Sequence, residues 1–178
     1  KTSSTLENAF EKYVKPEMLA NENAYMCTKC KQKNPAQKRF SIHKAPNVLT
    51  VSLKRFDYNR MMGKISRQVS ISEKLNIRPY MSNKQGDPVM YNLYAVLVHS
   101  GVHCNSGHYY CFVKSPSQVW HCMNDSMVSQ VSANRVLSSE AYLLFYIKAK
   151  PPQSLQKQKT PLIGPVQPNH TINHKHNS

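Results

Sequence analysis

The chain has 178 residues, of which 40% are hydrophobic, which is enough for one domain with its own core. Lys and Arg outnumber Asp and Glu by 24 to 9, and the basic residues are scattered along the chain, so a solvated basic surface explains the net charge of +15 better than a nucleic-acid site does. The composition argues against a membrane protein, which needs an apolar run of about 20 residues. The five cysteines, odd in number, argue against a secreted disulfide framework.

The N-terminal segment predicts helices. Ser4 and Glu7 have the spacing of a capping box with Ser4 at the N-cap. Apolar residues follow at helical spacing, namely Leu6, Phe10, Tyr13 and Val14. Pro16 then favours a second short helix that ends at Leu19.

Most of the remaining chain predicts antiparallel strands. The expected strands are residues 38–43, 47–58, 64–71, 75–80, 91–99, 107–114, 118–123 and 141–148. Residues 59–63 resemble a hairpin turn with Gly63 at positive φ, and Ser132 caps a short helix over 132–138. Residues 91–99 are apolar on both faces, which places them at the centre of the sheet. We therefore expect an α+β fold.

The composition changes near residue 149. Pro, Gln, Lys, Asn and His dominate from there to the end, and no acidic residue occurs after Glu140. Such a segment buries too little apolar surface to order itself. We expect one folded domain over residues 1–148 and a disordered basic tail over 149–178.

Cys27 and Cys30 are separated by two residues, a spacing that lets two thiolates reach one Zn²⁺ from a tight turn. Tetrahedral zinc needs four ligands, and the sequence has no second pair of this kind. The pair therefore predicts half of a structural zinc site. A redox pair or a purely structural pair is the alternative.

His108 is the best candidate for a catalytic group. Gly101 and Gly107 bracket the loop before it, and Asn124 and Asp125 end the next predicted strand. A side-chain oxygen of either residue can accept the Nδ1 proton of His108 and leave Nε2 as a general base. The imidazole would then need a nucleophile.

The thiols of the chain are poor candidates for that nucleophile. Cys111 follows His108 by three positions on one predicted strand, so the two side chains point to opposite faces. Cys122 has apolar neighbours that indicate packing, and Cys104 lies in the preceding loop. The spacing suggests that the chain is part of an enzyme whose thiol lies elsewhere.

Four segments together resemble the C-terminal half of a ubiquitin-specific protease catalytic domain. They are residues 22–30 with the Cys pair, residues 47–56 ending in Leu53-Lys54-Arg55-Phe56, residues 91–101 with Gly107-His108-Tyr109-Tyr110, and residues 120–126 with 141–146. The resemblance runs from about Leu6 to Lys148. Within the family, residues 86–91 and 98–101 are most similar to the subfamily that includes ubiquitin carboxyl-terminal hydrolases 36 and 42, which are nuclear or nucleolar.

The resemblance implies a papain-like right-hand fold and thiol-dependent hydrolysis of the bond after the C-terminal Gly of ubiquitin. It assigns the general base to His108, the orienting role to Asn124 and an assisting carboxylate to Asp125. Gly101, Gly107 and Tyr109 would line the site for ubiquitin's tail, and Cys27 and Cys30 would be half of a zinc site.

The resemblance also places the nucleophilic Cys before Lys1, so we expect this chain to be inactive alone. Its expected partners are ubiquitin and ubiquitinated proteins, and its expected location is the nucleus, including the nucleolus, or the cytoplasm. The alternatives are a non-catalytic ubiquitin-binding module and, less favoured, a basic RNA-binding domain. His121 departs from the family's more usual Tyr, and Asn105-Ser106 departs from His-Ala.

Overall fold

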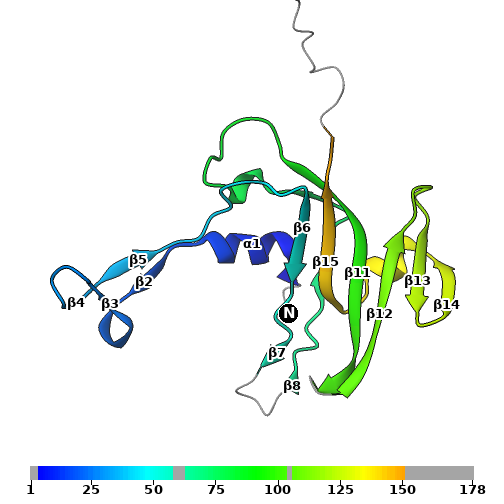
Figure 1. Ribbon diagram of the computed structural model, residues 1–178, viewed down its shortest axis with the longest axis horizontal. Coiled ribbons are helices and arrows are strands. Elements are labelled where there is room, and N and C mark those ends of the chain that lie inside the picture. Colours follow the sequence, from blue (N-terminus) through cyan, green and yellow to red (C-terminus); the bar gives the residue numbers. More distant parts are fainter. Residues whose placement is uncertain (1–3, 58–62, 104–105, 151–178) are drawn as a thin grey trace, which may run out of the picture.

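The computed structural model describes residues 4–57, 63–103 and 106–150. A broad antiparallel sheet forms the body, and a narrow arm extends from it beyond helix α1 (Figure 1). The elements of the N-terminal part are β1 (Ser4–Thr5), α1 (Leu6–Val14), β2 (Glu17–Leu19), η1 (Asn21–Asn23), β3 (Tyr25–Met26), β4 (Lys33–Asn34) and β5 (Ala36–Lys38). Within the described ranges, no helix combines the length and hydrophobicity needed to cross a membrane.

The body follows from residue 48 onward. Its elements are β6 (Val48–Ser52), β7 (Phe56–Asp57), β8 (Gly63–Lys64), β9 (Val69–Ser70), β10 (Lys74–Asn76), η2 (Arg78–Tyr80), β11 (Met90–His103), β12 (Ser106–Lys114), β13 (Trp120–Asn124), β14 (Met127–Val131), α2 (Ala133–Leu137) and β15 (Ala141–Lys148). The mixture of few helices with mainly antiparallel strands confirms the expected α+β class.

The long strand β11 organises the sheet. The main order is β14-β13-β12-β11-β15-β6, and β10 and β8 also pair with β11. Tyr91, Leu93, Val96 and Val98 of β11 are all at most 4% exposed. The apolar run therefore does lie at the centre of the sheet, as its two-sided hydrophobicity predicts.

The core forms where α1 and η2 cover the sheet. Leu6 of α1 is 1% exposed, and the ring of Phe10 stacks on that of Tyr80 at 5.0 Å between centroids. Tyr146 of β15 is fully buried and donates its hydroxyl hydrogen to the Ser72 carbonyl oxygen. Packing of this kind fixes the strands rigidly, which is what a site at their ends requires.

The arm, residues 17–38, is a pair of two-stranded ribbons. β2 pairs with β5 at its base and β3 pairs with β4 near its tip. The segment expected to be a second short helix, Pro16 to Leu19, is instead mostly strand β2. Four residues are too few to stabilise a helix, and pairing with β5 satisfies the backbone groups of β2.

Several helix and strand boundaries predicted from the sequence differ from those of the structure. Thr5, not Ser4, caps α1, since its hydroxyl oxygen accepts the Asn8 N–H. Residues 38–43 do not form one strand: β5 ends at Lys38, and Ile42 makes a single bridge to Met81. Residues 64–71 are divided between β8 and β9, and β14 was not predicted at all.

Arg55 explains why the strand predicted over 47–58 is interrupted. Its side chain is 3% exposed and donates to the carbonyl oxygens of Ala141, Ile65 and Arg67 at 2.5, 3.0 and 2.8 Å. Burial lowers the pKa of this guanidinium. The chain leaves β6 after Ser52 and resumes as β7, while Arg55 ties this break to two other segments of the backbone, one at residues 65–67 and one at Ala141. The turn predicted over 59–63 and the tail predicted over 149–178 lie mostly outside the described residues.

Candidate active site

The candidate site lies at the edge of the sheet where β11 and β13 end and β12 begins. His108 of β12 pairs with Ser100 of β11, and Cys111 pairs with Met123 of β13. By this register His108 and Asn124 project from the same face of the sheet, two positions apart along the strands. Sheet pairing therefore brings together two side chains that the sequence only suggested as partners.

The imidazole of His108 is bonded to Asn124. Its Nε2 lies within hydrogen-bond distance of Asn124 Oδ1. Because an amide oxygen only accepts, Nε2 carries the proton, and the lone pair of the neutral ring is on Nδ1. The expected arrangement, with the proton on Nδ1, was wrong. Nε2 is the outer nitrogen of the ring, and only this atom reaches a side chain on the adjoining strand.

Asp125 is the charged group beside the pair. Its Oδ2 lies 3.8 Å from His108 Nε2, and its side chain is 79% exposed against 49% for His108. Asp125 has φ of 52° in the turn that joins β13 to β14. Asp tolerates this left-handed conformation better than most residues. The tight turn therefore presents the carboxylate toward the imidazole, where it can stabilise a protonated ring, although solvent screens the interaction.

Gly101 and Gly107 lie in the strands themselves and not at the borders of a simple loop. A Cβ on Gly107 would stand 2.5 Å from both His99 Nε2 and the Ser100 carbonyl oxygen. A Cβ on Gly101 would stand 2.6 Å from the Ser106 carbonyl oxygen. Real Cβ atoms do not approach so closely, so glycine is needed at both positions for the strands to close beside His108.

Tyr109 is 48% exposed and projects from the face opposite to His108. Its ring lies 4.6 Å from that of His99 and 6.2 Å from that of Tyr142. About half of the residue is thus exposed, while its ring packs against His99 and Tyr142. Tyr109 can therefore contact a substrate that lies near Gly101 and Gly107, as expected. It cannot contact the His108 ring directly, because the two side chains project from opposite faces of β12.

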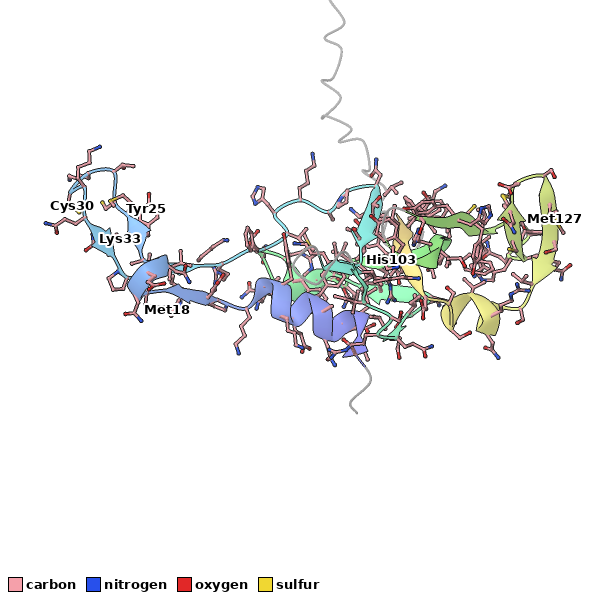
Figure 2. All side chains as sticks on the ribbon, turned by 90° about the horizontal axis from the view of Figure 1, so that it is seen from below. Met18, Tyr25, Cys30, Lys33, His103 and Met127 are labelled. Carbon is pink, nitrogen blue, oxygen red and sulfur yellow. The ribbon has the colours of Figure 1, made fainter. Side chains whose placement is uncertain are left out.

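The described thiols do not meet His108. Cys111 points to the other face of β12, and burial raises the pKa of its thiol. Cys122 is 8% exposed, in agreement with its expected packing role. Cys30 lies at the tip of the arm, far from His103 in the body, in Figure 2. Cys104 lies outside the described residues.

Cys27 and Cys30 share one turn between β3 and β4. Lys31 N donates to the Cys27 carbonyl oxygen, and Cys27 N donates to the Gln32 carbonyl oxygen, both at 2.9 Å. Hydrogen bonds from the backbone of Cys30 and of Lys29 lower the pKa of Cys27. A lowered pKa favours the thiolate that a metal requires. Among the described residues, no group of three or more His, Cys, Asp or Glu side chains could hold a metal ion.

Two residues beside the site were missed. His99 is 2% exposed and lies under Gly107, and the Lys64 side chain is 6% exposed and binds the His99 carbonyl oxygen. His99 ends the apolar run of residues 91–99, and a polar residue in such a run is expected to be buried, so the sequence did carry a signal for it. Nothing in the local sequence indicates that Lys64 would be buried.

Comparisons with known proteins agree on one family. The model of the family described as ubiquitin carboxyl-terminal hydrolase matches residues 6–146. The chain is 52% identical over 149 residues to human ubiquitin carboxyl-terminal hydrolase 42, covering 84% of this chain and 11% of that protein. It is 47% identical over 135 residues to mouse ubiquitin carboxyl-terminal hydrolase 17-like protein C, covering 75% and 24%.

Solved structures give the same result. A chain of the yeast SAGA DUBm superposes with a TM-score of 0.73 at 35% identity, covering 83% of this chain and 33% of that one. The SAGA Ubp8/Sgf11/Sus1/Sgf73 DUB module bound to ubiquitin aldehyde gives a TM-score of 0.73 at 33% identity, covering 84% and 34%. The chain thus spans about a third of each solved chain and 11% and 24% of the two curated relatives.

Proposed function

Because this chain belongs to the ubiquitin carboxyl-terminal hydrolase family, we propose that it supplies the general-base half of a thiol-dependent deubiquitinase site. The observation that carries the proposal is the hydrogen bond between His108 and Asn124. It fixes the ring with a free lone pair, as a general base requires. The ubiquitin aldehyde bound to the similar DUB module supports ubiquitin as the ligand.

In this mechanism His108 Nδ1 takes the proton of a thiol supplied from outside the described residues. The thiolate attacks the carbonyl carbon of ubiquitin's last Gly, the C–N bond after that carbon breaks, and the imidazolium gives its proton to the departing amine. Water, deprotonated by the same ring, then releases ubiquitin from the thioester. Asn124 holds the Nε2–H throughout, and Asp125 stabilises the positive ring that forms twice per cycle.

The isolated chain should not hydrolyse a fluorogenic ubiquitin C-terminal amide. Loss of a nucleophile costs about 10⁶-fold in triad enzymes, which places turnover below detection. Turnover that disappears in Cys104→Ala, Cys111→Ala or Cys122→Ala would show that the nucleophile lies within the chain. Binding of ubiquitin without turnover in any context would favour the non-catalytic module.

A segment exchange tests the base directly. Residues 6–148 would replace the matching segment of human hydrolase 42, the 52% identical relative. We expect His108→Ala to lower kcat of this chimera by about 10⁴-fold and Asn124→Ala by about 10²-fold. His121→Ala is the matched control, because His121 projects from the opposite face of β13. Equal losses in all three variants would refute the assignment.

We also propose that Cys27 and Cys30 contribute two thiolates to a structural zinc site of the arm, with two further ligands from outside the described residues. The shared turn and the lowered pKa of Cys27 fit that role. Zinc content of the purified chimera is the measurement. A Cys27→Ser, Cys30→Ser double variant should lose zinc, and unchanged zinc content would exclude these ligands.

The family resemblance further supports a nuclear location, which we propose for the protein that carries this chain. Imaging of a fluorescent fusion measures it directly. Exclusion of the fusion from the nucleus would refute the proposal.

A further inference from the structure

Lys64 is a buried cation next to the candidate site. Its side chain is 6% exposed, and an ammonium removed from water needs an opposite charge and hydrogen bonds to compensate. Nζ has both, since it donates to the His99 carbonyl oxygen at 2.6 Å and pairs with Glu140 Oε2 at 3.0 Å. Lys64 therefore ties β8 to β11 and to the residue just before β15.

The carbonyl oxygen that Lys64 binds belongs to the residue whose ring supports both glycines. His99 is 2% exposed and lies against Tyr109. Besides the close approach of Gly107 to its Nε2, a Cβ on Gly101 would come within 3.1 Å of its Cε1. A shift of His99 would therefore displace the ring against which Gly101 and Gly107 pack.

The backbone ladder is irregular at this same point. β11 and β12 pair without interruption from Ala95 and Val113 to Ser100 and His108, and the register then shifts before His103 pairs with Ser106. Such a bulge leaves some backbone groups unpaired, so the register of the two strands is less firmly fixed beyond it. His108 stands at the last regular pair, so ladder bonds fix it from one direction only.

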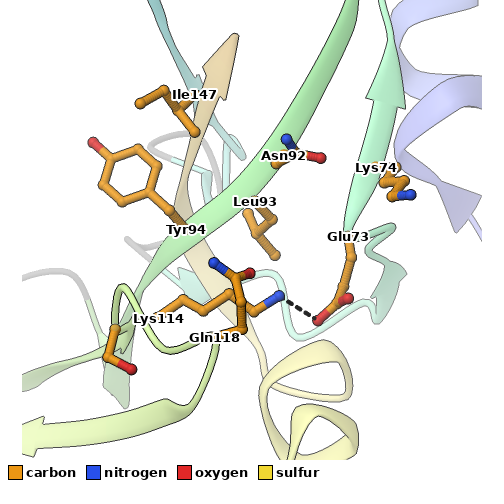
Figure 3. Close-up of a pocket in the computed structure, with 9 residues that line it drawn as sticks. Glu73, Lys74, Asn92, Leu93, Tyr94, Lys114, Gln118 and Ile147 are labelled. Atoms are coloured by element: carbon orange, nitrogen blue, oxygen red, sulfur yellow. Dashed lines mark hydrogen bonds and ion pairs between the residues drawn. The ribbon is translucent and has the colours of Figure 1, made fainter. Parts of the chain in front are cut away.

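We propose that Lys64, acting through His99, is a positioning residue for His108. By holding the His99 carbonyl oxygen, it fixes the closure of Gly101 against Gly107, and this closure turns Nε2 of the His108 ring toward Asn124. The catalytic consequence rests on the proposed function, but the position of the ring does not. The pair formed by Lys114 and Glu73 at the other end of β12, at 3.3 Å, is a natural control (Figure 3).

NMR of the full chain tests the position of the ring. Two-bond correlations between ring protons and ring nitrogens show which nitrogen of His108 is protonated, measured above the ordinary imidazole pKa. We expect the Nε2–H form alone in the unmodified chain and a mixture of both forms in Lys64→Met. Lys64→Arg, which keeps a donor cation, should restore the single form. Lys114→Met should leave it unchanged.

An unchanged His108 signature in folded Lys64→Met overturns the proposal, and so does an equal change in Lys114→Met. If Lys64→Met does not fold, Glu140→Gln decides, because Glu140 is 44% exposed and its loss leaves the rest of the core intact. A partial shift toward the mixture supports the proposal, and an unchanged signature overturns it.

The chimera separates this proposal from the proposed function. There, Lys64→Met should lower kcat by about tenfold to 10²-fold, with KM within about twofold, because a misplaced base slows chemistry more than binding. An inactive chimera with the expected tautomer change would refute the proposed function alone. Normal kcat in folded Lys64→Met would refute the positioning role.

Discussion

The sheet and the arm differ in what holds them together. Residues 17–38 are all described, and none of them is buried, whereas every buried residue of the hydrophobic cluster belongs to α1 or to the body. Two-stranded ribbons alone are marginally stable in water. The sheet can therefore hold a rigid hydrogen-bonded site, while the arm depends on its few strand pairings.

This contrast predicts very different responses to truncation of side chains. Leu144→Ala, at a fully buried position of β15, should lower the free energy of unfolding by about 2–5 kcal/mol. Met18→Ala in the arm, where the side chain is 63% exposed, should change it by less than about 0.5 kcal/mol. Urea unfolding followed by fluorescence of the buried Trp120 measures both. Equal losses would show that the arm and the sheet unfold as one unit.

The two regions should also differ in thiol reactivity. Hydrogen bonds lower the pKa of Cys27 in the arm, and burial raises the pKa of Cys111 in the sheet. Because the thiolate is the reactive form, iodoacetamide at neutral pH should alkylate Cys27 at least about tenfold faster. The ratio should narrow as pH rises and Cys111 ionises. Mass spectrometry of the modified peptides gives both rates, and similar rates at neutral pH would contradict the assigned pKa directions.

A ring stack connects the two regions. Tyr13 at the end of α1 stacks on Phe40 at 5.4 Å, and the Lys38 ammonium lies 4.8 Å from the Phe40 centroid. Aromatic pairs contribute about 0.5–1.5 kcal/mol, so Tyr13→Ala should raise amide exchange in β2 and β5 by about fivefold and leave β11 unchanged. Tyr25→Ala, nearer the tip of the arm, is the control. Faster exchange throughout β11 would show that the stack stabilises the body instead.

The smallest effect is expected at the far end of the sheet. Glu73 accepts hydrogen bonds from Trp120 Nε1 at 3.2 Å and Lys114 Nζ at 3.3 Å, and the Trp120 bond is the main cause of its lowered pKa. A carboxyl whose pKa falls on folding stabilises the protein above its unfolded-state pKa. That contribution is lost as pH falls through the folded-state pKa.

Glu73→Gln should therefore reduce stability at pH 7 by about 0.5–1 kcal/mol, and solvent screening keeps this value small. The difference from the unmodified chain should shrink in acid. Urea unfolding at neutral and acidic pH measures it. Glu22→Gln, an exposed control in the arm, should have no effect, and a pH-independent loss in Glu73→Gln would contradict the role of the charge.

The sequence determined the elements whose pattern is long and strongly periodic. Residues 91–99 were correctly placed at the centre, and the strands at 107–114, 118–123 and 141–148 were predicted to within a few residues. The contact between the side chains of His108 and Asn124 was also expected, because the two residues lie on strands that were predicted to be neighbours. Short segments such as β2 and β4 were not predicted as strands, because pairing with another strand overrides the preferences of two or three residues.

Tertiary structure alone decided which atoms meet at the site. The distance between strands selected Nε2, and not Nδ1, as the partner of Asn124. Arg55 is buried because carbonyl oxygens from two separate parts of the chain accept its hydrogen bonds. Lys64 is buried because the His99 carbonyl oxygen and the Glu140 carboxylate meet its ammonium. A sequence records that a side chain is charged, but its burial depends on partners that folding supplies, and those partners are far away along the chain.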